Sequence, residues 1–196
     1  MITIFSILFK TKDTLDYLDN QGTDELDTNC RLIFLFLGAF SGFASFYGDL
    51  DHFRKFFGEN EVVFFWVLST LLGAGLTDLI GRYLLTYILY GLGKLLQGVG
   101  SVIDIRLVAA YSLIPRFFEL PIFLYFKLFG NINGYYGFEY WSINIFHFLI
   151  SIWSFKILMQ GIMRFNKLGH GKALLNISPI LIVMIAPYLL YYIIRY

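Results

Sequence analysis

The stretch EVVFFWVLSTLLGAGLTDLIGRYLLTYILYGLGKLLQG, residues 61–98, decides the class of this protein. It is almost continuously apolar, and as a single helix it would be about 57 Å long. About 20 apolar residues are enough to cross the roughly 30 Å of hydrocarbon in a bilayer. The stretch is therefore either one long helix, straight or broken near Gly73, Gly75 or Gly81, or a hairpin of two spans turning at Gly81-Arg82.

The composition of the whole chain supports a polytopic membrane protein. Hydrophobic residues make up 58% of the 196 residues and charged residues 15%, whereas soluble domains carry about 25% charged residues. These values exclude a soluble globular enzyme and a disordered chain. A net charge of +1 provides no basic excess for nucleic acid, and the single cysteine, Cys30, cannot form an intrachain disulfide.

Four further apolar stretches are predicted to cross the membrane, at residues 32–47, 104–129, 138–164 and 173–194. The connector 164–172 holds basic residues and no acid, and the loop 130–137 holds no basic residue. The positive-inside rule therefore places 164–172 in the cytoplasm and 130–137 outside. An all-α bundle of five spans follows if 61–98 crosses once, with the N-terminus inside. A hairpin would give six spans, and charge alone leaves both open.

The N-terminal segment differs from the rest of the chain. Six of the fourteen acidic residues lie in the first thirty positions. We therefore expect residues 1–30 to form a cytoplasmic tail with a short interfacial segment at 4–9, and residues 31–196 to form the transmembrane domain. The alternative is that the segment docks a cytoplasmic partner.

The sequence holds none of the common enzyme motifs, such as a nucleophile elbow, a P-loop or a dinucleotide fingerprint. Its three histidines are far apart, so no metal, cofactor or catalysis is expected. We expect His147, within a span, to form a hydrogen bond to a neighbouring helix. An enzyme acting on lipid would need His147 and Glu139 together, but they are about 12 Å apart along a helix.

Two charge pairs lie within predicted spans. Asp78 and Arg82 are four residues apart on one helix face. Arg116 and Glu119 are three apart and follow Pro115, which should kink its helix. A charge at mid-membrane costs about 2.5–3.5 kcal/mol on insertion scales, and pairing reduces that cost. We interpret the pairs as a polar network that fixes helix packing, with a polar cavity for substrate, ion or partner as the alternative.

Small and basic residues mark other helix surfaces. Gly38 and Gly42 have the spacing that allows close helix approach. Lys94, Lys127 and Lys156 are predicted to extend their ammonium groups to the membrane interface.

Two segments resemble the Yip1 family. The glycine-rich run at 98–101, followed by Ala110-Tyr111-Ser112-Leu113-Ile114-Pro115, resembles the turn and helix of that family's central signature. A later group is similar to its fourth helix and the connector after it: Trp153, Ile157, Leu158, Gly161, Leu168 and Lys172-Ala173. The resemblance covers roughly residues 61–196, with a weaker similarity near Leu8-Phe9-Lys10.

The resemblance implies five spans, a cytoplasmic N-terminus and no catalysis. Eukaryotic Yip1-like proteins act in vesicle trafficking and bind small Rab-type GTPases and one another. Their acidic-aromatic-proline motif is not evident before Phe64-Phe65-Trp66, and the N-terminal segment is short. Both departures argue against a small GTPase partner. The sequence looks more like the bacterial branch, which implies the bacterial inner membrane.

The predicted function is that of a non-enzymatic membrane scaffold or accessory subunit. It would lie in the lipid bilayer, contact other membrane proteins or further copies of itself, and bind no nucleic acid. The alternative is a small transporter or channel component that uses the charged residues within its spans.

Overall fold

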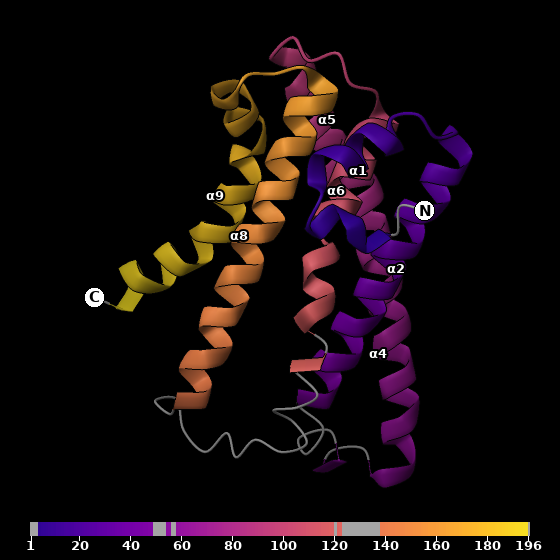
Figure 1. The fold of residues 1–196 in the computed structure, drawn as a ribbon. Helices are drawn as coiled ribbons and strands as arrows, with labels where there is room; N and C mark the ends of the chain where they lie inside the picture. Colours follow the sequence, from indigo (N-terminus) through magenta and orange to yellow (C-terminus); the bar gives the residue numbers. More distant parts are fainter. Residues whose placement is uncertain (1–3, 49–53, 56–57, 120, 123–137, 196) are drawn as a thin grey trace.

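The computed structural model describes residues 4–48, 54–55, 58–119, 121–122 and 138–195. Every regular element in these ranges is helical, which confirms the all-α class. The elements are η1 (Ile4–Leu8), α1 (Thr11–Leu18), α2 (Thr23–Gly48), α4 (Glu59–Leu79), η2 (Ile80–Leu85), α5 (Thr86–Leu95), α6 (Val102–Ser112), η3 (Ile114–Phe118), α8 (Phe138–Asn166) and α9 (His170–Arg195). Figure 1 shows the long helices packed alongside one another.

Within the part of the chain that the structure describes, two helices are long and apolar enough to cross a membrane, Glu61–Leu95 and Trp141–Asn166. Five spans therefore stay a prediction. The loop at 130–137, predicted to lie outside the membrane, falls outside the described residues.

The long apolar stretch that begins at residue 61 forms one continuous helix as far as Leu95, so the interpretation of this stretch as a hairpin is wrong. α4, η2 and α5 follow one another without a break, and η2 is a π-helical turn. The hydroxyl of Thr86 donates a 2.8 Å hydrogen bond to the carbonyl oxygen of Gly81, five residues earlier. The ring of Phe34 packs where a side chain at Gly81 would lie. Gly81 therefore allows Phe34 of α2 to pack closely against this helix, and the chain does not reverse direction there.

α6 is the central helix, and its residues from Ile105 to Ser112 are all buried. It lies between α2 and α8 and contacts both (Figure 1). Its start is fixed by a capping box, in which the backbone N–H of Asp104 donates to Ser101 and the carboxylate of Asp104 accepts from the Ser101 N–H. This arrangement satisfies two backbone donors that an uncapped helix would leave free.

The N-terminal segment is folded onto the core, which corrects the expectation of a solvated tail. Ile7 and Leu15 are 0% and 2% exposed. The guanidinium of Arg164 in α8 lies 2.8 Å from the carboxylate of Asp16 and 3.6 Å from that of Asp19. The sequence suggested a tail because the acidic residues obscured the apolar positions between them. The expected boundary at residue 30 also lies within α2, which begins at Thr23.

Candidate functional site

The structure brings four charged residues together where α2, the α4–α5 helix and α6 meet. One carboxylate oxygen of Asp27 in α2 lies 2.7 Å from the guanidinium of Arg82. Its other oxygen is paired with the guanidinium of Arg106 in α6. Asp78 lies 3.7 Å from Arg82 on the same helix. We call Asp27, Asp78, Arg82 and Arg106 the charge cluster.

The charge cluster is largely withdrawn from solvent. The side chains of Arg82 and Arg106 are 12% and 11% exposed, and the ring of Tyr83 lies beside both guanidinium groups, 5.5 and 5.9 Å from its centroid. Two carboxylates balance two guanidinium groups, so the cluster is close to neutral. Burying such charges is tolerable only when each has a partner. The arrangement therefore ties three helices together.

Sequence reasoning found half of the charge cluster. The Asp78–Arg82 contact follows from spacing within one helix, whereas Asp27 was assigned to a tail and Arg106 was not singled out. The available signal was the position of Asp27, five residues before the apolar run that begins at Leu32. Arg31, which is largely exposed, lies 4.0 Å from Asp78 at the edge of the cluster.

The second predicted pair has a different partner. Among the described residues, Glu119 is paired with His147 of α8, at 3.3 Å between Oε1 and Nδ1, and not with Arg116. Pro115 occupies the first turn of η3, directly after α6 ends at Ser112. η3 packs against α8, and Glu119, directly after η3, lies within reach of His147. His147 thus contacts a neighbouring element, as expected.

Gly38 and Gly42 lie at the closest approach of α2 and α4, which run side by side (Figure 1). A Cβ atom at Gly38 would lie 2.6 Å from Cβ of Thr77, closer than real side chains come. The hydroxyl of Ser69 donates a 3.0 Å hydrogen bond to the carbonyl oxygen of Gly42. The missing side chains let the two backbones touch, as small residues do in membrane helices.

Sequence reasoning missed two buried asparagines, one bonded to the glycine-rich turn before α6 and the other to α5. Oδ1 of Asn166 accepts a 3.1 Å hydrogen bond from the backbone N–H of Gly100. Nδ2 of Asn176 donates a 3.1 Å bond to the carbonyl oxygen of Leu89. Gly93 lies against both amides, with no room for a Cβ atom. We call Asn166 and Asn176 the asparagine cluster, which joins α5, α8, α9 and the turn.

The family follows from comparison with known proteins. A family model described as the Yip1 domain matches residues 6–191. The chain belongs to the Yip1 family. No curated protein and no solved structure matches it. The Yip1 family is generally one of non-enzymatic membrane proteins. Among the described residues, no group of three or more His, Cys, Asp or Glu side chains could hold a metal ion.

The Yip1 match includes the N-terminal segment as well as the helices. It begins at Ser6, ahead of the buried Ile7, and it contains the charge cluster, the asparagine cluster and the glycine-rich turn. The turn that carries the Yip1 resemblance thus has a structural reason here. Its glycines let Asn166 approach the backbone, because a Cβ atom at Gly98 or Gly100 would lie 2.7 Å from Oδ1 of Asn166.

Proposed function

We propose that this Yip1-family protein is a non-enzymatic membrane scaffold or accessory subunit. It contacts other membrane proteins, or further copies of itself, through the outward face of α4, η2 and α5. The charge cluster and the asparagine cluster keep this long helix fixed against the rest of the molecule.

The length of that outward face carries the proposal. Large apolar side chains are exposed along it without interruption: Val63, Phe64, Val67, Leu68, Leu71, Leu72, Leu76, Leu79, Ile80, Tyr83, Leu84, Tyr87 and Ile88. From Val63 to Ile88 the face is about 38 Å long, whereas the hydrocarbon core is about 30 Å thick. Lipid alone would cover it only if the helix tilted to nearly 40°, the upper end of the observed range. A protein partner at one end of the face removes this mismatch.

The charges support an orientation for the scaffold. Lys94, Lys167 and Lys172 lie at the end of the molecule where α5 ends and α9 begins. The positive-inside rule favours the cytoplasm for this end. The part of the apolar face beyond the bilayer, near Leu84 and Ile88, then lies at the cytoplasmic boundary. The similarity to bacterial Yip1-like proteins favours the bacterial inner membrane.

The experiment is purification of the tagged full chain from its native membranes in a mild detergent, with the stoichiometry of co-purifying proteins measured. Leu84→Glu and Ile88→Glu place a charge on the outward face. Leu175→Glu places the same charge on an exposed apolar position of α9 and is the matched control. We expect a stoichiometric partner or homo-oligomer that the first two variants lose and the control keeps. A monomer without partner, or equal loss in all three variants, would contradict the proposal.

No observation on the described residues favours a transporter. Asp78 and Glu119, the acids that a transporter would use, are both held by basic partners, Arg82 and His147. Scaffolding therefore remains the function that the arrangement supports best.

A further inference from the structure

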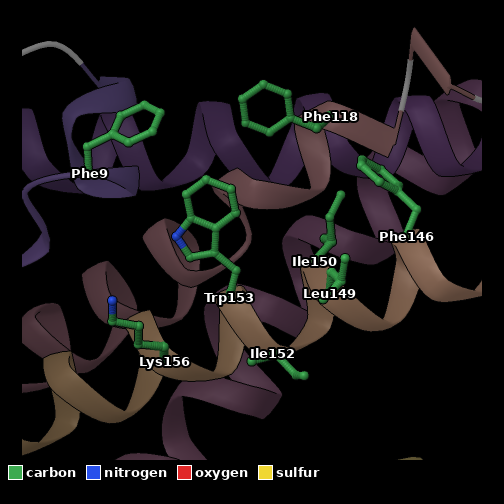
Figure 2. A pocket seen from close by; sticks show the side chains of 8 residues that line it. All are labelled: Phe9, Phe118, Phe146, Leu149, Ile150, Ile152, Trp153 and Lys156. Carbon is green, nitrogen blue, oxygen red and sulfur yellow. The ribbon is translucent and has the colours of Figure 1, made fainter.

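An apolar groove lies on the surface of α8, on a different part of the molecule from the α4–α5 face. Figure 2 shows its side chains, which come from the turn after η1, from η3 and from α8. The groove has a volume of about 720 Å³ and is lined chiefly by Phe9, Phe118, Phe146, Leu149 and Trp153, with Lys156 as the one charged residue among the described side chains that line it. This volume lies within the range of sites that hold small molecules, about 300–1,000 Å³.

Aromatic contacts fix the walls of the groove. The indole N–H of Trp153 donates a 3.1 Å hydrogen bond to the carbonyl oxygen of Leu8. The ring of Phe118 stacks on Trp153 at an interplanar angle of 7°, and Phe9 meets Trp153 edge-on at 6.0 Å between centroids. The fold of the N-terminal segment therefore shapes the groove, because Phe9 lines it and the carbonyl oxygen of Leu8 holds Trp153 in place.

The groove has the dimensions of one membrane leaflet. Phe146 and Lys156 lie near its two ends (Figure 2) and are ten residues apart on α8. Ten residues extend about 15 Å along a helix, which is half of the roughly 30 Å hydrocarbon core. Lys156 lies toward Arg164, the side that we expect in the cytoplasm. Trp153, three residues before Lys156, bonds to Leu8 of the N-terminal segment that we expect at the membrane interface. An acyl chain lying along the groove would then have its headgroup level with Lys156.

The charge of Lys156 indicates which kind of ligand the groove binds. Its side chain is exposed and makes no ion pair or hydrogen bond with any part of the chain that the structure describes. A lysine above an apolar groove at headgroup depth attracts a phosphate. We propose that the groove binds one acyl chain of an anionic glycerophospholipid from the leaflet on the Arg164 side, with the lipid phosphate on Nζ of Lys156.

The test uses the full chain in a mild detergent, mixed with dioleoyl phosphatidylglycerol and dioleoyl phosphatidylcholine, and native mass spectrometry to count bound lipids. Because the acyl chains are identical, any preference reports the headgroup. We expect one retained lipid and about a fivefold preference for phosphatidylglycerol, the effect of one lysine at an anionic surface. Lys156→Gln should remove the preference while the lipid is still retained.

A pair of variants tests the position of the acyl chain. Leu149→Trp fills the groove, whereas Ile145→Trp adds the same ring at an equally exposed position of α8 that does not line it. We expect Leu149→Trp to lose the lipid and Ile145→Trp to retain it. Equal binding of both lipids by the unmodified chain would overturn the proposal. So would equal retention in the two tryptophan variants, or a second copy of the chain held at this face in place of lipid.

Discussion

The guanidinium of Arg82 lies 2.7 Å from the carboxylate of Asp27, although the two residues are 55 positions apart in the chain. The same carboxylate is paired with Arg106, 79 positions away. One acidic side chain on α2 therefore holds the long helix and the central helix together. This part of the charge cluster makes Asp27 more important to the fold than Asp78, whose closest basic partner lies on its own helix.

Asp27→Asn should lower the stability of the protein by about 2 kcal/mol, because two guanidinium groups lose a charged acceptor. For a chain of this size the melting temperature should fall by about 4–8 °C. The measurement is thermal unfolding in a mild detergent. Asp24→Asn, at an exposed acid in the first turn of α2, should change little. An equal effect of both substitutions would mean that general charge, and not the cluster, stabilises this region.

Gly38→Ala and Gly42→Ala should each destabilise the protein by about 1–3 kcal/mol, the usual effect of overpacking. The added methyl group would meet Thr77 in the first case and the backbone of Ser69 in the second. Gly75→Ala is the matched control, since a Cβ atom there has nothing within 4 Å. Thermal unfolding of the three variants separates packing from helix propensity. If Gly75→Ala is equally destabilising, close approach of the helices is not the cause.

Asn166→Ala should destabilise by about 1–3 kcal/mol, because the buried N–H of Gly100 loses its acceptor. Asn20→Ala, which removes an exposed amide that bonds within α1, should have little effect. Hydrogen exchange at Gly100 provides a local readout. Its amide should exchange faster in Asn166→Ala, and unchanged exchange would show that the asparagine cluster does not hold the turn.

Leu15→Ala should destabilise by about 2–5 kcal/mol, the range for a large side chain removed from a core. A solvated tail would show no such effect. Tyr17→Ala removes a 44% exposed ring from the same helix and should cost much less. Thermal unfolding compares the two variants. Equally small effects of both substitutions would show that α1 contributes little to the core.

Helix content and local pairs were predictable from the sequence, because both depend on neighbours along the chain. The apolar runs predict helices, and Asp78 with Arg82 follows from a four-residue spacing. Long-range choices were not predictable. Glu119 has Arg116 within reach along the chain but pairs with His147, because η3 packs against α8.

The N-terminal segment shows a second limit of sequence reasoning. Its acidic residues suggested exposure, yet Asp16 and Asp19 face Arg164, while Leu15 and Leu18, each directly before one of these acids, are buried. The helical spacing of the apolar residues was the signal that separates the buried face from the acidic face. α1 has only eight residues, so this spacing was too short a pattern to favour burial over the exposure that the acidic residues suggested.

The π-helical turn at Ile80–Leu85 determines which way the side chains of α5 point around the helix axis. A wide turn contains one more residue than an α-helix needs, and one residue corresponds to about 100° of rotation. If residues 80–85 wound as a regular α-helix, Leu89 and Gly93 would therefore rotate away from the core and from Asn166, and α5 would lose its register with α6 and α9. Deleting one residue within 80–85 would remove the extra residue together with the wide turn, so a regular α-helix would form and α5 would keep its register. In this protein, the wide turn takes up one extra residue and so keeps the two halves of a single long helix facing the same interior.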